Sequence, residues 1–186
     1  MIEIVDIRYC RLGTTDLDSA VTFATELIGL EEVDRSDSQV YLRGDHRDHN
    51  ICYFEGDPNN QSFGLEVRSF ADLDAAASTL QAAGVDVRRG TEAEAAARRV
   101  MGFINFSDPT GNAVDLVVRP FHSGRRYFPS RDAGITDFSH IGLKTTDPAR
   151  DEKFWSGLFN IRANDRIGAA ELMAFDEGHH RIALFP

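Results

Sequence analysis

The fold is decided by the stretch Asp137-Phe138-Ser139-His140-Ile141-Gly142-Leu143-Lys144-Thr145-Thr146-Asp147, because an earlier copy of it occurs in the same chain. The earlier copy reads Asp6-Ile7-Arg8-Tyr9-Cys10-Arg11-Leu12-Gly13-Thr14-Thr15-Asp16, which places the two copies 131 residues apart. The same offset continues without a gap almost to the end of the chain. An internal repeat of this length indicates that one supersecondary unit is used at least twice. His140 stands out within it, since its counterpart is Tyr9.

Length, charge and composition exclude several classes of protein. The chain has 186 residues, of which 42% are hydrophobic and 27% charged, as expected of an ordinary globular protein. Its formal net charge of −10 argues against nucleic-acid binding, which needs clustered Lys and Arg. No stretch approaches the roughly 18 apolar residues of a membrane span, and the acidic start lacks a secretory signal. We therefore expect a cytoplasmic protein without membrane contacts.

The two cysteines, Cys10 and Cys52, each lie in a strand-like run. We expect them to be buried free thiols rather than a disulfide pair. Without a CxxC pair or a nearby cluster of Cys and His, they also do not predict a zinc site.

The first copy of the repeat predicts a strand, a helix and then further strands. Residues 7–13 are predicted as a strand, with Thr15 or Asp16 capping the helix and Gly29 ending it. We interpret the apolar stripe of this helix as core packing. The stripe consists of Ala20, Phe23, Ala24, Leu27 and Ile28. The later strands are predicted at residues 40–43 and 50–54.

A second unit follows with the same order of elements. Its strands are predicted at residues 63–67, 85–87, 102–106 and 113–118, and its helix at residues 73–83. Asp72 or Asp74 is expected to start this helix. Residues 92–99 fit either a helical turn or a charged loop. The segment Asp108-Pro109-Thr110-Gly111-Asn112 predicts a tight turn between the last two strands.

The third unit repeats the pattern around His140. Asp147 is the expected N-cap and Pro148 the first helical residue. The helix face is predicted to be core and consists of Phe154, Trp155, Leu158 and Phe159. The last strands are predicted at residues 171–175 and 180–185.

These units predict an α+β fold of paired βαβββ modules, since one such unit cannot bury its apolar face alone. Residues 1–118 are predicted to form one domain of two paired modules, residues 119–136 a linker, and residues 137–186 the first half of a second domain. The third module lacks a fourth to cover its sheet. We therefore expect either that the chain is a fragment of a longer protein or that another copy provides the missing half. Self-association as a homo-oligomer is the expected consequence.

Four segments carry a resemblance to a known family. They are the turn at residues 108–112, Pro120-Phe121-His122-Ser123-Gly124, Ser139-His140-Ile141-Gly142-Leu143 and Gly178-His179-His180-Arg181-Ile182-Ala183-Leu184. In this order and spacing, the chain resembles the type I extradiol catechol dioxygenases, especially the 2,3-dihydroxybiphenyl 1,2-dioxygenase group. These enzymes belong to the vicinal oxygen chelate superfamily, which includes glyoxalase and bleomycin resistance proteins. The resemblance covers the whole chain but only about the first two thirds of such an enzyme.

The resemblance implies an oxidoreductase of aromatic hydrocarbon catabolism that holds Fe(II) between two histidines and one carboxylate. His140 matches the first histidine ligand, and His180 matches the histidine that acts as acid and base beside the substrate. The other histidine ligand and the glutamate would lie in the fourth module, so the remaining Fe(II) ligands are not present in this chain. The implied substrates are O2 and a catechol with an aryl or fused-ring substituent. Dioxygen would be inserted next to the two hydroxyls.

Plainer interpretations of the same residues stay open. Without the resemblance, His140 is an ordinary structural histidine, because Tyr9 fills the same place in the first copy. His180 has His49 as its counterpart, where no catalysis is expected. The alternative function is a metal-free module of the same superfamily that binds an aromatic ligand or a partner chain without catalysis.

By the same resemblance, the first domain can be checked for a metal site of its own. Its positions equivalent to the three metal ligands are Tyr9, Ser62 and Asp115. Only the carboxylate is a credible Fe(II) ligand, which fits a metal-free first domain.

Overall fold

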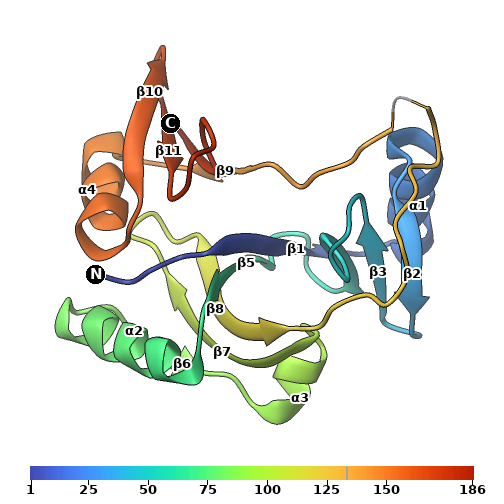
Figure 1. Ribbon diagram of the computed structural model, residues 1–186, viewed down its shortest axis with the longest axis horizontal. Coiled ribbons are helices and arrows are strands. Elements are labelled where there is room, and N and C mark those ends of the chain that lie inside the picture. The colour runs from blue at the N-terminus through green and yellow to red at the C-terminus, as the bar shows by residue number, and fades with distance from the viewer. Residues whose placement is uncertain (133) are drawn as a thin grey trace. The chain divides into compact units, whose positions relative to one another are not determined.

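The computed structural model describes residues 1–132 and 134–186 and has the mixed α+β architecture that the sequence predicts (Figure 1). It divides into two compact units. The smaller unit comprises residues 8–63 and 120–138, and the larger unit comprises residues 1–7, 64–119 and 139–186. The domain bounds 1–118, 119–136 and 137–186 stay a prediction, and Ala133 of the predicted linker lies outside the described residues. No helix in the described ranges is long and apolar enough to cross a membrane.

The smaller unit contains a four-stranded arrangement in the order β2-β3-β4-β1. Its elements are β1 (Asp6–Thr14), α1 (Leu17–Thr22), the π-helix η1 (Phe23–Ile28), β2 (Glu31–Arg35), β3 (Gln39–Arg43) and β4 (Ile51–Glu55). As predicted, Asp16 caps α1 by accepting a hydrogen bond from the Ser19 N–H, and Gly29 ends η1 with a φ of 91°. Strand β2 was not predicted.

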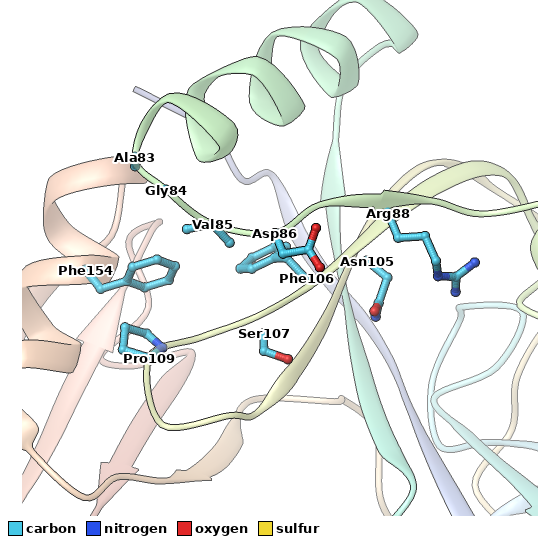
Figure 2. Close-up of a pocket in the computed structure, with 10 residues that line it drawn as sticks. All are labelled: Ala83, Gly84, Val85, Asp86, Arg88, Asn105, Phe106, Ser107, Pro109 and Phe154. Carbon is cyan, nitrogen blue, oxygen red and sulfur yellow. The ribbon is translucent and has the colours of Figure 1, made fainter.

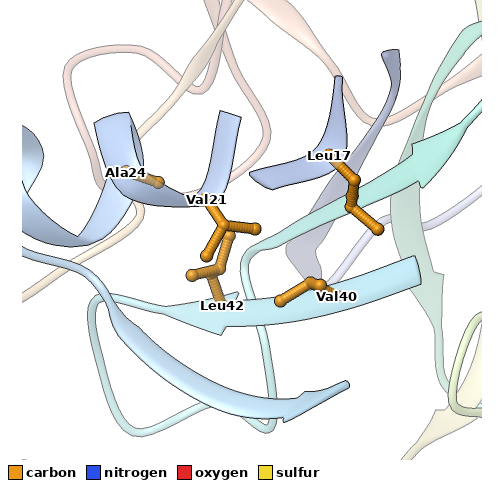
Figure 3. Close-up of a cluster of buried hydrophobic side chains, with 5 residues drawn as sticks. All are labelled: Leu17, Val21, Ala24, Val40 and Leu42. Carbon is orange, nitrogen blue, oxygen red and sulfur yellow. The ribbon is translucent and has the colours of Figure 1, made fainter. Parts of the chain in front are cut away.

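The core of this unit is smaller than the sequence predicts. Figure 3 shows Leu17, Val21 and Ala24 of the helical segment meeting Val40 and Leu42 of β3. The core interpretation of the helical stripe is wrong at three of its five positions. Those positions are Phe23, Leu27 and Ile28, which are 50%, 67% and 38% exposed.

The buried face of the helical segment is centred on Leu17, Val21 and Ala24, which directs Phe23 away from the core even at ordinary α-helical spacing. The N–H of Gly29 donates to the carbonyl of Ala24, five residues earlier, at 3.0 Å. A helix with this hydrogen-bond spacing advances each residue by a smaller angle than an α-helix does. Because Phe23 is the first residue of η1, the wider turn changes only the directions of the residues that follow it.

Residues 121–138, apart from Ala133, form an irregular segment that is part of the smaller unit. The Arg43 guanidinium donates to Ser123 Oγ at 2.8 Å and pairs with Glu31 at 2.9 Å. Ser130 Oγ donates to the carbonyl of Gly29 at 2.9 Å. These contacts hold the segment along its length.

The middle part of the chain forms strands in the order β5-β8-β7-β6. Its elements are β5 (Gln61–Val67), α2 (Phe70–Ala82), β6 (Arg88–Arg89), α3 (Glu92–Ala96), β7 (Val100–Ser107) and β8 (Ala113–Pro120). Ser69, not Asp72 or Asp74, is the N-cap of α2, because its hydroxyl accepts a hydrogen bond from the Asp72 N–H. The strand predicted at residues 85–87 is wrong, since β6 begins at Arg88.

Two local signals explain the rest of this part. A capping box between Thr91 and Glu94 starts α3, which decides residues 92–99 in favour of a helical turn. In the predicted tight turn, one oxygen of Asp108 accepts hydrogen bonds from three successive backbone N–H groups, those of Thr110, Gly111 and Asn112. Gly111 has a φ of 103°, as expected of glycine at such a turn.

The last part of the chain forms a second sheet in the order β10-β11-β12-β9. Its elements are β9 (Ile141–Lys144), α4 (Pro148–Leu158), β10 (Arg162–Ile167), β11 (Ala170–Ala174) and β12 (Ile182–Phe185). Asp147 caps α4 with Pro148 at its start, as predicted. Trp155 and Phe159 are fully buried, which confirms the predicted core face at these two positions. Strand β10 was not predicted.

The pairings of the strands confirm the internal repeat. Strand β1 pairs with β4 in parallel, with Cys10 opposite Ile51, and β9 pairs with β12 in parallel, with Ile141 opposite Ile182. Both residues of the second pair lie 131 positions after those of the first. The irregularity in register at Glu32/Asp34 also recurs 131 positions later, at Ala163/Asp165.

Candidate functional site

His140 and His180 lie side by side in the larger unit. His140 immediately precedes β9, and His180 lies two residues before β12, the parallel neighbour of β9. The N–H of Ile141 donates to the carbonyl of Arg181 at 3.1 Å, which aligns the starts of the two strands. The two imidazole rings are 4.3 Å apart between centroids, at an interplanar angle of 52°. The parallel pairing thus brings together two residues that are 40 positions apart in the sequence.

Arg181 holds the backbone next to His140. Its Nη1 donates to the carbonyl of Ser139 at 3.0 Å, and its Nε pairs with the carboxylate of Asp176 at 2.9 Å. The same carboxylate accepts a hydrogen bond from the Gly178 N–H at 2.9 Å. Sequence reasoning did not single out Arg181, although the segment that carried the resemblance includes it.

The electrostatic surroundings favour a neutral imidazole at His180. Burial lowers its pKa below the ordinary value of 6.5, and positive charge on His140, His179 and Arg181 lowers it further. The Nδ1 atoms of His179 and His180 are 3.0 Å apart. A neutral imidazole can accept a proton from a nearby hydroxyl, which is the property that an acid/base histidine needs.

His179 is positioned by the neighbouring strand. Its Nε2 lies 3.4 Å from the carboxylate of Asp165, and its carbonyl accepts a hydrogen bond from Asn164 Nδ2 at 2.9 Å. Both partners belong to β10, the strand that was not predicted.

The donors that the described residues bring together do not make a complete metal site. Within residues 1–132 and 134–186, no group of three or more His, Cys, Asp or Glu side chains could hold a metal ion. His140 is exposed and His180 is half-buried, so the pair offers imidazole nitrogens without a carboxylate between them. Fe(II) in non-haem oxygenases is held by two histidines and one carboxylate.

The counterpart pair in the smaller unit is built differently. Tyr9 and His49 are 1% and 5% exposed, and their rings stack with centroids 5.3 Å apart. Tyr41 packs edge-on against His49 at 5.1 Å, and Asp48 lies 3.2 Å from its Nδ1. This pair is closed off by core packing.

Asp115, the one carboxylate at a ligand-equivalent position of the predicted first domain, is also committed to the protein. One of its oxygens accepts a hydrogen bond from Arg98 Nε at 2.8 Å, and the other accepts one from Asn105 Nδ2 at 2.8 Å. Its side chain has no exposed surface. Both contacts give Asp115 a structural role in the larger unit.

Two solved structures with the same fold are catechol dioxygenases. A halotolerant catechol dioxygenase, BphC, superimposes with a TM-score of 0.86 at 22% identity, covering 99% of this chain and 65% of that one. A catechol 2,3-dioxygenase superimposes with a TM-score of 0.80 at 26% identity, covering 99% of this chain and 67% of that one. The fold is therefore that of the vicinal oxygen chelate class.

The sequence comparison identifies the family. Residues 6–116 match the family described as Glyoxalase/Bleomycin resistance protein/Dioxygenase superfamily, and the chain belongs to this superfamily. A biphenyl-2,3-diol 1,2-dioxygenase of Sphingomonas paucimobilis is 28% identical over an alignment of 201 positions, which covers 98% of this chain and 67% of that protein. A 1,2-dihydroxynaphthalene dioxygenase of Sphingobium xenophagum is 30% identical with the same coverage.

The name of a third relative states which metal it depends on. It is an iron-dependent extradiol dioxygenase of Rhodococcus jostii (strain RHA1), 28% identical over 178 residues that cover 89% of this chain and 57% of that protein. The chain thus spans between about half and about two thirds of the length of these relatives. The resemblance seen in the sequence is confirmed at the level of the family.

Proposed function

We propose that the chain is part of an Fe(II)-dependent extradiol dioxygenase that cleaves a catechol with an aryl or fused-ring substituent. Dioxygen is inserted next to the two hydroxyls. The observation that carries the proposal is the pair formed by His140 and His180, with ring centroids 4.3 Å apart at the ends of paired strands. The names of two relatives, a biphenyl-diol dioxygenase and a dihydroxynaphthalene dioxygenase, support the substrate class.

The two histidines take different roles. His140 is the proposed metal ligand, and His180 is the proposed acid/base residue that takes a proton from a substrate hydroxyl and returns it later. Bound Fe(II) would supply open coordination positions for the two catechol oxygens and for dioxygen. The other ligands have to come from residues that the described part of this chain does not gather. Arg181 is a positioning residue, since it holds the carbonyl of Ser139.

The proposal also covers the domains of the chain and its location in the cell. We propose that residues 1–118 act as the non-catalytic domain, that residues 119–136 link it to residues 137–186, and that the protein is cytoplasmic.

We also propose that the protein forms a homo-oligomer. Ile167 and Phe185, on strands of the second sheet, are 66% and 50% exposed, and β10 is exposed along its whole length. Exposed edge strands with apolar side chains favour pairing with another chain.

One observation favours the second candidate function, a metal-free module that binds an aromatic ligand or a partner chain. The same strand pairing brings Tyr9 and His49 together as a buried ring contact in the smaller unit. In that case, the His140–His180 pair would be a structural contact, as the pair of Tyr9 and His49 is.

The test compares three variants of the protein expressed from its complete gene. After anaerobic loading with Fe(II), bound iron is measured, and 2,3-dihydroxybiphenyl and O2 are added to follow the yellow ring-fission product. We expect His140→Ala to lose both iron and activity. His180→Ala should keep iron and lose activity by about 10² or more, the usual contribution of a general acid/base group. His122→Ala, at an exposed position of the linker, is the control and should match the unsubstituted protein. Absence of iron and product from the unsubstituted protein would establish the metal-free alternative.

A further inference from the structure

The larger unit contains a cavity of about 540 Å³ that sequence analysis did not predict (Figure 2). It lies where the C-terminal end of α2, strand β7 and helix α4 meet. None of its lining residues belongs to the His140–His180 pair. Its volume is in the range of sites that hold one small organic molecule.

One end of the cavity is apolar and stiff. Phe106 and Phe154 face it, with ring centroids 6.3 Å apart and planes tilted by 46°. Phe106 also stacks on the fully buried Phe159 at 6.1 Å, which fixes its ring. Val85 and Pro109 complete this end, as Figure 2 shows. Phe106 is only 2% exposed, so the half-buried Phe154 provides the ring surface against which another aromatic ring can pack.

The other end presents hydrogen-bond acceptors. Asn105 uses both hydrogens of its amide, one on the carbonyl of Val114 at 3.2 Å and one on Asp115 at 2.8 Å. Its Oδ1 is therefore the polar atom that it can offer to a ligand, and this atom only accepts. The exposed carboxylate of Asp86 lines the same end and is a stronger acceptor.

The guanidinium of Arg88 does not change the preference of this end of the cavity for hydrogen-bond donors. Arg88 also lines the cavity, but its Nη1 donates to Glu94 at 2.8 Å. The charge of the guanidinium is thereby engaged by a carboxylate outside the cavity. A ligand that brings hydrogen-bond donors fits this end better than an anion does.

We propose that this cavity binds a small hydroxylated aromatic molecule of the phenol or catechol type. The ring lies against Phe154, which Phe106 supports from behind, one hydroxyl donates to the carboxylate of Asp86, and a second hydroxyl, where present, donates to Asn105 Oδ1. The proposal goes beyond the proposed function, because it requires neither iron nor ring cleavage.

The test is a titration of the metal-free ¹⁵N-labelled chain with catechol, followed by backbone NMR shifts. We expect the largest shift changes at residues 83–88 and 105–107. In 1,2-dimethoxybenzene both hydroxyl hydrogens are replaced by methyl groups, so this probe should bind at least about tenfold more weakly. Asp86→Ala should weaken catechol binding about tenfold, since it removes a charged acceptor from an exposed position. Asp37→Ala, also at an exposed aspartate but away from the cavity, is the control and should bind as the unsubstituted chain does.

Two results would overturn the inference. One is equal binding of catechol by the Asp86→Ala and Asp37→Ala variants. The other is shift changes confined to residues around His140 and His180. A His140→Ala, His180→Ala double variant separates this inference from the proposed function, because cavity binding should survive in it unchanged while ring cleavage cannot.

Discussion

The rings of His140 and His180 lie 4.3 Å apart, and their counterparts 131 residues earlier, Tyr9 and His49, lie 5.3 Å apart. The same strand pairing produces both contacts. The earlier pair is closed off, with exposed fractions of 1% and 5%, whereas His140 is exposed and His180 half-buried. One repeated architecture therefore places a pair of rings at the same point twice, once as core and once as a site open to solvent.

The Arg181 side chain should stabilise the backbone at His140. Arg181→Met removes the hydrogen bond to Ser139 and the pair with Asp176, and we expect the free energy of unfolding to fall by about 1–2 kcal/mol. Urea denaturation measures the change. Arg68→Met is the control, because Arg68 is 71% exposed and its nearest carboxylate is 3.8 Å away; its effect should stay within about 0.5 kcal/mol. Equal effects of the two changes would contradict the role of Arg181.

The loss of unfolding free energy when a phenylalanine is replaced by alanine should depend on how deeply the ring is buried. Phe159 has no exposed surface, and we expect Phe159→Ala to lower the free energy of unfolding by about 3–5 kcal/mol. Phe23 is 50% exposed on the π-helix, and Phe23→Ala should cost less than about 1 kcal/mol. Thermal unfolding of both variants checks the difference. A larger loss at Phe23 would show that the helical stripe is core after all.

Removing only the arginine of the buried Arg98–Asp115 ion pair should lower the free energy of unfolding more than removing both charges does. Their side chains are 9% and 0% exposed, with 2.8 Å between Nε and Oδ2. Arg98→Met takes the guanidinium away from the buried carboxylate of Asp115, and we expect the free energy of unfolding to fall by about 3–5 kcal/mol. Adding Asp115→Asn removes that charge and should recover part of the loss. A double variant less stable than Arg98→Met alone would contradict this account, and chemical denaturation of both proteins decides the matter.

Two glycines should respond to alanine in opposite directions. Gly157 lies within α4 with no atom near the position of an added Cβ, so Gly157→Ala should raise the free energy of unfolding by about 0.5–1 kcal/mol. Gly111 also has open space, but its φ is 103°, and Gly111→Ala should lower stability by about 1 kcal/mol or more. Melting temperatures of the two variants test the signs. A rise at both positions would mean that the turn can change its backbone conformation.

Asp45 should make the stability of the protein sensitive to acid. Burial raises its pKa, but the backbone N–H and the charge of Arg47 and the hydrogen bonds from Asn50 and Phe138 outweigh burial, so its pKa lies below the ordinary value of 3.8. A lowered pKa in the folded state means that its contribution is present above about pH 4 and is lost as the pH falls through the folded pKa.

The expected comparison is between the unsubstituted protein and Asp45→Asn. The variant should be less stable at neutral pH and should lose less of its stability between about pH 5 and pH 2. Denaturant midpoints across this range measure the slope. Parallel curves for the two proteins would remove Asp45 as a source of acid sensitivity.

Two strands, β2 and β10, were not predicted from the sequence. Strand β2 reads Glu31-Glu32-Val33-Asp34-Arg35, and β10 (Arg162–Ile167) is exposed at every position. Neither carries the alternation of apolar and polar residues that predicts a strand. Their conformation depends on backbone pairing with β3 and β11. Such edge strands become visible only when their partners are in place.

The sequence by itself determined the repeat, and with it the strand-then-helix start of each unit, the caps of α1 and α4 and the superfamily, because these follow from residue identity and local spacing. Only the tertiary structure decided that Phe23 faces solvent and that Asp115 is bound by Arg98 and Asn105. It also decided that His140 and His180 meet. The physical reason is that these properties depend on contacts between segments far apart in the chain, which the spacing of residues along one segment does not encode.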